Sequence, residues 1–485
     1  MITCHSEPEP FTSFRINSAE AKPVLSAVEG NLVVCIAERL LTKNGILRRS
    51  APQNDKSPYH CSGATICFRR EKRVVHIMTV SSSCPAPNFR TQRTRRQQVR
   101  LAFLRLFARL SALFLPISNL QSPFSILHPP SSILLIRPDH LGDLLFTTPA
   151  LRALRAAFPQ ARITGLIGPW AEAVVTSNPS LDEVMLCPFP GFTRQPKKSF
   201  IEPYIVLRRY ARLLREKEFD LAVVLRFDHW WGALLAYLAH IPRRVGYDIA
   251  EVRPFLTDAI PYVSGRHEVE QNLALMEAAG VQGEHPITPS AYPLEFPLNA
   301  QDREFAPRYL AEQGVGDNDP LVCIHPGAGA PVKLWRNEGW AQVADALVEK
   351  YAAKVILTGA DSEAPLMQAI AERMACQPII AAGQTTLRQL AALLARCRLV
   401  LGADSGPLHL AVAVGSPTVH LYGPVDSRTF GPWGDPSRHI VLISDMDCIP
   451  CNRLDYRVGE LEDHRCVWNI SEAQVTEAAR RLLDS

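Results

Sequence analysis

A short segment in the carboxyl-terminal half of the chain has the residue types and spacing of a phosphate-binding site. Residues 404–409 read DSGPLH and follow an apolar run of strand length. Ser405 can cap the helix that starts here and donate a hydrogen bond, and Gly406 lets the backbone approach a ligand closely. Amide groups at a helix amino terminus point toward bound anions. With Asp404 before them and His409 one turn into the helix, these residues predict a diphosphate site.

A lysine on a glycine-rich loop supplies a cation for the same predicted site. Lys333 lies in the loop over 327–335, which follows an apolar run over 321–326. Taken alone, Lys333 is equally consistent with a surface lysine, but both motifs follow strands whose ends we expect to be adjacent. The loop lacks the full G-x-G-x-x-G pattern, which counts against a dinucleotide redox cofactor. Asp361 follows another apolar run, over 355–359, and could accept hydrogen bonds from a ribose.

A carboxylate in the first half of the body, residues 132–298, is a candidate site residue. Asp143 ends the loop over 138–143, between an apolar run of strand length and a helical pattern. A carboxylate at such a strand end lies where ligands of a parallel sheet bind, although an ordinary first-turn carboxylate of a helix also fits the local sequence. Gly142 allows a tight turn and leaves room for a substrate. Asp139 and His140 share this loop and are weaker candidates.

The runs that flank these motifs predict an α/β fold with two doubly wound parallel sheets. Apolar stretches of strand length alternate with helical patterns, which is typical of parallel sheets. Ligands of such sheets bind at the carboxyl ends of the strands. We therefore predict two domains, over 132–298 and 299–485. Their predicted strands lie at 133–137, 162–167, 219–225 and 244–247, and at 321–326, 355–359, 379–383, 399–404 and 418–422.

The amino-terminal extension differs in composition from this body. Residues 1–130 contain 18 Lys and Arg against 7 Asp and Glu, whereas the remaining residues contain 34 against 41. Residues 1–92 show no sustained period, which predicts disorder; a translation start near Met78 is an alternative explanation. Arginines interleave with Leu and Phe over 93–115, which predicts a basic helix that lies on an anionic membrane surface or packs on the body. Together with a proline-rich linker this segment spans 93–131.

Composition and cysteine usage exclude several classes of protein. A mildly acidic body argues against nucleic-acid binding, which needs clustered basic side chains. Residues 1–20 lack the apolar core of a signal peptide, and no apolar stretch of the body predicts a membrane span. Twelve cysteines without regular spacing favour a reducing, cytoplasmic setting. Cys448, Cys451 and Cys466 lack an obvious fourth zinc ligand, so we predict no metal site.

Three motifs occur together, and in this order, in one enzyme family. They are Gly142-Asp143, Lys333-Leu334-Trp335 and Asp404-Ser405-Gly406-Pro407-Leu408-His409. Through them the chain resembles the ADP-heptose:lipopolysaccharide heptosyltransferases over residues 131–485. That resemblance implies the GT-B fold, in which two Rossmann-like domains face each other across a cleft, with Asp143 at the position of the family's proposed base. Arg336 departs from the family pattern, because many members have proline after the tryptophan.

The same resemblance implies roles for the second domain and its loops. Lys333 matches the phosphate-binding lysine of the family. Asp404, Ser405 and Gly406 match its donor loop, and His409 matches the histidine of that motif. By this comparison the second domain binds the nucleotide sugar, and the first domain binds the acceptor.

The activity that the resemblance implies is an inverting, metal-independent glycosyl transfer. Heptose would pass from ADP-heptose to a lipopolysaccharide-core or other cell-envelope glycan, and the nucleotide sugar would be a substrate, with no cofactor. We expect a cytoplasmic protein, on the inner-membrane surface if residues 93–115 bind there. Two alternatives remain open: a sugar-nucleotide epimerase of the same architecture, and a non-catalytic protein that binds sugar nucleotides.

Overall fold

The chain divides into two compact units, Met1–Arg96 and Gln97–Ser485. The computed structural model describes residues 129–193, 199, 201–283 and 286–485, together with five strands before residue 81 and the single positions 98 and 102. The predicted basic helix over 93–115 therefore lies outside the described residues, apart from those two positions, and so does most of the linker that follows it.

Five strands in the first unit form an antiparallel sheet with the order β1-β2-β5-β4-β3. They are β1 (Thr3–His5), β2 (Phe11–Asn17), β3 (Tyr59–Cys61), β4 (Ala64–Glu71) and β5 (Val74–Val80). The other residues of 1–92 lie outside the described part of the chain, and the disorder that the sequence predicts for this extension stays a prediction.

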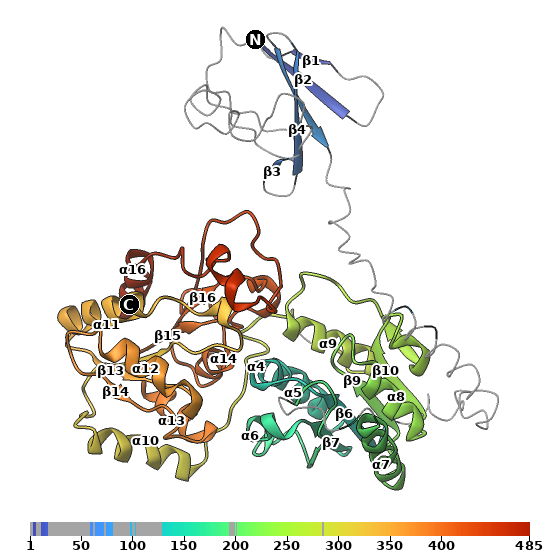
Figure 1. Cartoon of the computed structure of the whole chain (residues 1–485). Coiled ribbons are helices and arrows are strands. Elements are labelled where there is room, and N and C mark those ends of the chain that lie inside the picture. Colours follow the sequence, from blue (N-terminus) through green and yellow to red (C-terminus); the bar gives the residue numbers. More distant parts are fainter. Residues whose placement is uncertain are drawn as a thin grey trace. The chain divides into compact units, whose positions relative to one another are not determined.

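The first half of the second unit is a six-stranded sheet with the order β11-β10-β9-β6-β7-β8, in which every pair runs parallel. Its strands are β6 (Ser132–Arg137), β7 (Arg162–Ile167), β8 (Glu183–Leu186), β9 (Leu221–Val224), β10 (Arg243–Tyr247) and β11 (Asp258–Ile260). Its helices are α4 (Leu141–Leu145), α5 (Thr148–Ala157), α6 (Glu172–Val175), α7 (Glu202–Glu216), α8 (Trp230–Leu238) and α9 (Glu268–Ala279) (Figure 1).

Both faces of this sheet are buried. Successive side chains of a strand point to opposite faces, so Ile133 and Leu135 of β6 enter one apolar cluster and Leu134 and Ile136 enter the other. Helices α5 and α9 contribute to the first cluster, whereas α7 and α8 contribute to the second. Burial on both faces explains why the central strands read as continuous apolar runs.

The second half repeats this design with a parallel sheet of order β14-β13-β12-β15-β16-β17. Its strands are β12 (Leu321–His325), β13 (Lys354–Leu357), β14 (Ile379–Ile380), β15 (Leu399–Ala403), β16 (Thr418–Tyr422) and β17 (His439–Ile443). Its helices are α10 (Ala300–Glu312), α11 (Asn337–Tyr351), α12 (Ala364–Ala371), α13 (Leu387–Arg396), α14 (Gly406–Ala413), α15 (Ser427–Phe430) and α16 (Glu472–Leu483).

Each strand that the sequence predicts for the body is present, and three edge strands were missed. β8 and β11 are short and only half-buried, so they lack the apolar run that marks a central strand. β17 follows the single-turn helix α15 and a turn-rich loop, so no clear alternation of strand and helix precedes it. The predicted α/β class with two doubly wound sheets is confirmed.

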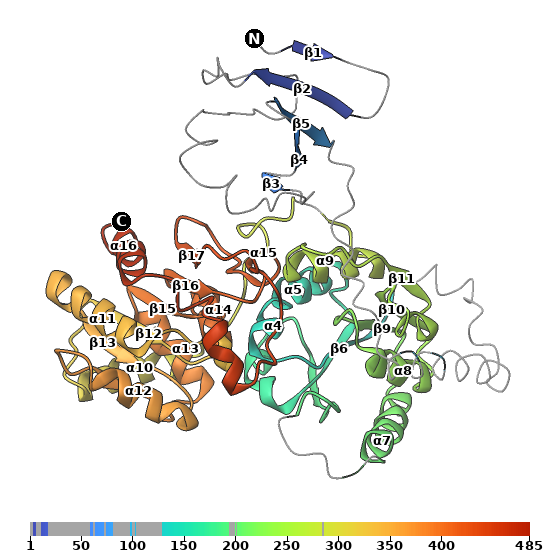
Figure 2. The ribbon, with the colours of Figure 1, turned by 45° about the horizontal axis from the view of Figure 1, so that its top comes forward.

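The two halves of the body meet where helix α4 of the first half contacts helix α14 of the second. Helix α4 follows β6, and helix α14 follows β15, so both begin at the carboxyl ends of their strands. The two helices pack against each other (Figures 1 and 2). This contact brings the candidate base and the predicted phosphate loop to one place. No helix among the described residues is long and apolar enough to cross a membrane.

Candidate active site

Lys333 and Asp404 form the centre of the predicted donor site. β12 and β15 are neighbours in the sheet, so the loops that follow them lie side by side. Lys333 ends a short 3-10 turn, η4 (Pro331–Lys333), and its Nζ lies 2.7 Å from Asp404 Oδ2. The same Nζ donates a hydrogen bond to the backbone oxygen of Asp404 at 3.2 Å. The sequence-predicted pairing of the two motifs is therefore present as an ion pair.

Asp404 stays ionised in this environment. Burial alone would raise the pKa of its carboxyl group, but hydrogen bonding with His409 and the charge of Lys333 lower the pKa to about 2. His409 Nε2 lies 3.9 Å from Asp404 Oδ1 and sits on the first turns of α14. The amides at the start of α14 lie next to this ion pair and can attract an incoming anion together with Lys333.

Three buried polar atoms of the motif have no hydrogen-bond partner among the described residues: Asp404 Oδ2, Ser405 Oγ and His409 Nδ1. Asp404 Oδ2 has the ion pair with Lys333, which leaves Ser405 Oγ and His409 Nδ1 free. Ser405 occupies the N-cap position of α14, but its side chain makes no capping bond, contrary to the sequence prediction. Buried polar groups are normally satisfied, so two free groups beside a helix amino terminus are available to a ligand's phosphate oxygens.

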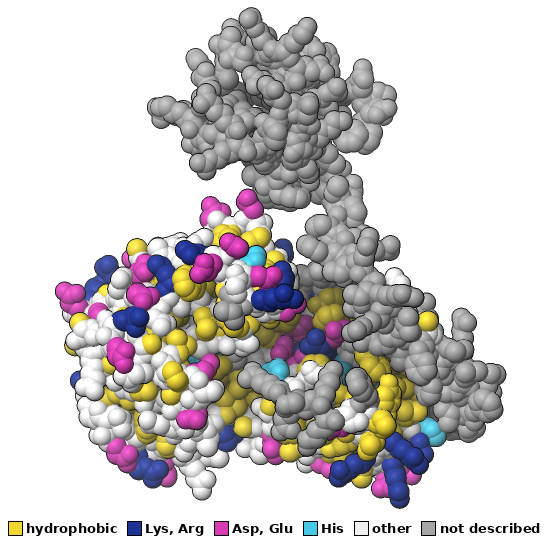
Figure 3. Space-filling view, in the orientation of Figure 1, with side chains coloured by type: hydrophobic (Ala, Val, Ile, Leu, Met, Phe, Trp, Pro, Cys, Tyr) yellow, Lys and Arg dark blue, Asp and Glu magenta, His cyan; other side chains and the backbone are white. Residues whose placement is uncertain are grey.

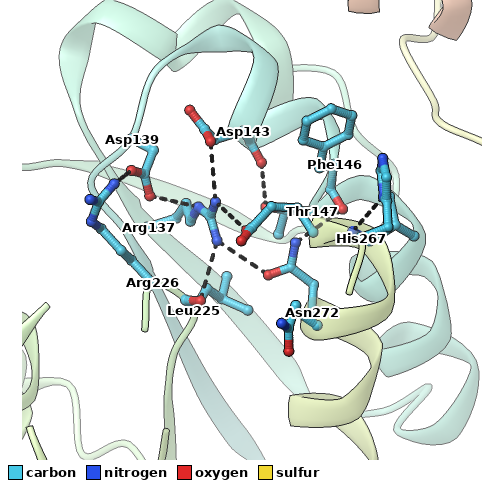
Figure 4. Close-up of polar contacts among 12 residues, drawn as sticks. Arg137, Asp139, Asp143, Phe146, Thr147, Leu225, Arg226, His267 and Asn272 are labelled. Atoms are coloured by element: carbon cyan, nitrogen blue, oxygen red, sulfur yellow. Dashed lines mark hydrogen bonds and ion pairs between the residues drawn. The ribbon is translucent and has the colours of Figure 1, made fainter. Parts of the chain in front are cut away.

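Asp143 lies in a network of charges around a buried arginine (Figure 4). Arg137, 3% exposed, ends β6. Its Nε lies 2.7 Å from Asp139 Oδ2, and its Nη2 lies 3.7 Å from Asp143 Oδ1 and 3.1 Å from Glu268 Oε2. It also donates to Asn272 Oδ1 at 3.2 Å. Sequence reasoning missed Arg137; the available signal was a charged residue at the end of an apolar strand.

The surroundings of Asp143 set the pKa of its carboxyl group near neutral pH. Burial raises the pKa of Asp143, and the nearby charge of Asp139 raises it further; Arg137 offsets only part of this, so the pKa is about 7. A side-chain exposure of 31% leaves a path for a substrate hydroxyl. A base whose pKa lies near the working pH combines availability with sufficient driving force for proton transfer.

Asp139 and His140, the weaker candidates of the same loop, make structural contacts. Burial would raise the pKa of Asp139, but Arg137 and Arg226 outweigh that effect and hold the pKa below its usual range. Asp139 therefore acts as a fixed counterion between two arginines (Figure 4). His140 is the N-cap residue of α4, and its ring centroid lies 5.6 Å from that of Trp170.

Gly142 contacts the other half of the body, and the prediction that it leaves room for a substrate stays a prediction. A Cβ atom at this position would lie 3.1 Å from His409 Cδ2 and 3.6 Å from Gly406 Cα. A Cβ atom on Gly406 would in turn lie 2.6 Å from a methyl group of Leu141. The ring of Phe146 meets the ring of His409 edge-on, with centroids 4.6 Å apart. The two glycines therefore permit close packing of α4 on α14.

Gly142→Ala should lower kcat for sugar transfer roughly tenfold, because a shift of a few tenths of an ångström at His409 or α4 misaligns base and donor. The added methyl group meets His409 at a distance tighter than ordinary contact. Steady-state kinetics would measure the effect, with Gly459→Ala as the control, since nothing lies within 4 Å of a Cβ there. A wild-type kcat in Gly142→Ala would contradict a functional contact between the helices.

Asp361, the candidate ribose ligand, lies on the surface after β13, where its side chain contacts Gly383. The side chain of Asp361 makes no hydrogen bond or ion pair within the described part of the chain, and its ribose role stays a prediction. Glu363 nearby accepts a hydrogen bond from the amide of Ala360 at 2.8 Å. Its carboxylate also lies against Gly327 of the glycine-rich loop. Sequence reasoning missed Glu363.

The cysteine loop packs beside the Lys333 loop, where Cys466 Sγ donates to the backbone oxygen of Val332 at 3.9 Å. Cys448 and Cys451 are exposed and Cys466 is buried. Within the described ranges, no group of three or more His, Cys, Asp or Glu side chains is arranged to hold a metal ion. The loop instead supports the segment after β16, where the amide of Asn452 donates to the backbone oxygen of Pro424 at 2.7 Å.

Comparisons with known proteins agree with this geometry. The model of glycosyltransferase family 9 (heptosyltransferase) matches residues 207–460. Lipopolysaccharide heptosyltransferase 3 of Escherichia coli is 29% identical over 301 residues, covering 61% of this chain and 84% of that protein. Lipopolysaccharide heptosyltransferase 2 of Salmonella typhimurium is 28% identical over 366 residues, covering 72% and 98%.

A solved glycosyltransferase family 9 structure from Veillonella parvula has the same fold. It is 29% identical, has a TM-score of 0.61, and covers 73% of this chain and 98% of that chain. The family match spans just over half of the chain and includes both Lys333 and the DSGPLH motif. With two Rossmann-like domains that meet where α4 packs on α14, the chain belongs to glycosyltransferase family 9, the heptosyltransferases.

Proposed function

We propose that the chain transfers a heptose from ADP-heptose to a lipopolysaccharide-core or other cell-envelope glycan, with inversion at the anomeric carbon and without a metal ion. The observation that carries this proposal is the direct packing of α4, which bears Asp143, on α14, which begins the DSGPLH motif. That contact sets a carboxylate of pKa about 7 beside groups suited to a diphosphate. Family membership supports the choice of sugar.

In the proposed reaction, Asp143 removes the proton of an acceptor hydroxyl as its oxygen attacks the anomeric carbon. A new carbon–oxygen bond forms while the bond to the diphosphate oxygen breaks, and the electron pair leaves with the nucleotide. Lys333, His409 and the amides at the start of α14 stabilise the negative charge on the departing diphosphate. Attack from the face opposite the leaving group inverts the anomeric configuration.

The nucleotide sugar is a substrate in this proposal, and no cofactor takes part. We also propose a cytoplasmic location, where nucleotide sugars are available, and a glycolipid or glycan acceptor. The basic segment over 93–115, which lies outside the described residues, remains our candidate for contact with the inner-membrane surface. The acidic composition of residues 131–485 supports no role in nucleic-acid binding.

A thermal-shift panel of nucleoside diphosphates and sugar nucleotides would test the donor site first. A ligand that binds only the folded state raises the melting temperature by several degrees at concentrations well above its Kd. A shift selective for ADP and ADP-sugars supports the proposed donor, whereas no shift with any nucleotide contradicts the donor site.

Incubation with radiolabelled ADP-heptose would then separate transfer from the two alternatives. Label in a glycan product supports the proposed reaction. An isomerised sugar nucleotide without any acceptor product would identify an epimerase. Binding without turnover, across a panel of truncated core glycans, would favour the non-catalytic sugar-nucleotide-binding protein.

A further inference from the structure

The outer face of α7 exposes a group of large apolar side chains. Ile201 just before the helix is 64% exposed, and Tyr204 and Ile205 on its first turn are 61% and 63% exposed. The helix buries Leu207 and Leu214 against the sheet instead. Three neighbouring apolar side chains of this size in water are unfavourable unless another surface covers them.

Unpaired arginines follow this apolar group along the same helix. Arg208 and Arg209 are exposed, and neither side chain makes an ion pair or hydrogen bond with any described residue. Arg212, also exposed, pairs only with Glu216 on its own helix, at 3.1 Å. Figure 3 shows Lys and Arg side chains beside hydrophobic ones at the lower right, where Figure 1 places α7. The α7 face, defined as Ile201, Tyr204, Ile205, Arg208, Arg209 and Arg212, is thus apolar at one end and basic at the other.

The apolar end of the α7 face lies at the sheet edge that carries the active site. Trp231 Nε1 at the start of α8 donates to Pro203 O at the start of α7, at 3.4 Å. Helix α8 starts just after β9, at the carboxyl end of that strand, next to β6 and its Asp143 loop. At the other end, Arg215 of α7 donates to Leu238 O, the end of α8, at 2.7 Å. The two helices therefore run in the same direction, and both begin at the active-site edge.

We propose that the α7 face docks the acceptor half of the enzyme on an anionic lipid surface. Apolar side chains of a surface helix enter the boundary between headgroups and acyl chains, and arginines bind the anionic headgroups. Charge selects this occupant, because Arg208 and Arg209 lack an acidic partner in the described body. A protein partner fits less well, since one side of a stable interface contributes roughly 20–30 residues.

Docking through α7 would place the carboxyl edge of the acceptor sheet beside the lipid surface, because α7 begins at that edge. A glycan that projects from that surface could then reach Asp143 without leaving its lipid anchor. This consequence for the acceptor rests on the proposed function, whereas binding of the α7 face to lipid does not.

Vesicle binding of the full-length chain would test the proposal. Vesicles of phosphatidylglycerol with phosphatidylcholine would be compared with phosphatidylcholine alone, using flotation for affinity and amide hydrogen exchange for the site of contact. The variants are Ile201→Ser with Ile205→Ser, and Arg208→Gln with Arg209→Gln. The matched control is Arg480→Gln with Arg481→Gln, which removes two exposed arginines from α16 at the other end of the chain.

We expect the wild type to bind anionic vesicles in a salt-sensitive manner, with slower exchange in α7. Each α7 variant should bind roughly tenfold or more weakly, and the control should bind as the wild type does. Unchanged affinity of the α7 variants would overturn the proposal. So would protection confined to another segment, such as 93–115, or protection of α7 that depends on protein concentration without vesicles, which would indicate a second copy.

Failure of the proposed function would be recognised separately. Transfer to a delipidated, soluble glycan should proceed at the wild-type rate in both α7 variants, because their substitutions lie outside the catalytic network. If the wild type bound vesicles through α7 but transferred no sugar, the lipid docking would stand and the proposed reaction would not.

Discussion

Asp143→Asn should lower kcat for sugar transfer by roughly 10²–10⁴-fold, the range that a general base contributes. The amide occupies the same space but cannot accept the hydroxyl proton. Asp143 Oδ1 lies 3.7 Å from Arg137 Nη2, which is a long ion pair. Because little stability depends on that pair, the variant should keep its fold. Steady-state kinetics and the donor-induced thermal shift would be measured together. A variant that binds donor normally and still transfers at the wild-type rate would exclude Asp143 as the base.

The pH profile provides a second signature of Asp143. Wild-type kcat/KM should rise with pH and level off above about pH 7, because only the deprotonated carboxylate can act as base and its pKa is about 7. The residual activity of Asp143→Asn should lack this rise. A wild-type profile that is flat between pH 5 and 8 would contradict the raised pKa.

The same pKa also predicts how stability depends on pH. Folded Asp143 keeps its proton up to about pH 7, whereas the unfolded carboxyl group loses it near the ordinary value of 3.8. The folded state therefore binds more protons between these values, and this group's contribution to stability falls as pH rises. The Asn side chain of Asp143→Asn does not titrate, so the stability of this variant does not fall with pH for this reason. Its melting temperature relative to wild type should increase from pH 4 to pH 8.

Lys333→Ala should have the second largest effect, on both donor use and stability. Removal of the cation takes charge stabilisation from the departing diphosphate, which we expect to lower kcat roughly 100-fold or more. Asp404, only 6% exposed, would keep its charge without its ammonium partner. Breaking a buried ion pair costs roughly 3–5 kcal/mol of unfolding free energy. Urea unfolding and initial-rate kinetics would measure the two effects.

A double variant separates the two roles of Lys333. Lys333→Met with Asp404→Asn replaces the ion pair by uncharged side chains of similar size, which should recover most of the lost stability. Transfer activity should remain low, because no cation faces the diphosphate. Recovery of activity together with stability would show that Lys333 acts only by keeping Asp404 neutralised, and would contradict a contact with the donor.

Packing of α4 on α14 joins the helix that carries Asp143 to the helix that begins the DSGPLH motif. The ring of His409 contacts Phe146 of the acceptor half and lies close to Asp404 of the donor loop. The ring of Phe146 also contacts the ring of His267. Nε2 of His267 lies 3.0 Å from the backbone oxygen of Gly431 in the donor half. A change at the phosphate loop therefore reaches the base helix through direct side-chain contacts.

Local sequence was sufficient for the features that depend on residues close together in the chain. The DSGPLH motif carries its own strand end, glycine and helix start, so its position at a helix amino terminus follows from adjacent residues. The central strands were found because burial on both faces demands continuous apolar runs. Short edge strands lack that pressure, which is why β8 and β11 were not predicted.

Local sequence determined which residues could do chemistry: a carboxylate and a phosphate loop at strand ends, with a lysine nearby. Only the tertiary structure decided the pKa values of these groups and the distances between them. Arg137 meets Glu268, 131 residues later, and that network surrounds Asp143. Gly142 meets His409 only because the two sheets pack at α4 and α14. Coulombic energy and steric contact depend on distance in space, and short-range sequence patterns do not encode the distance between residues far apart in the chain.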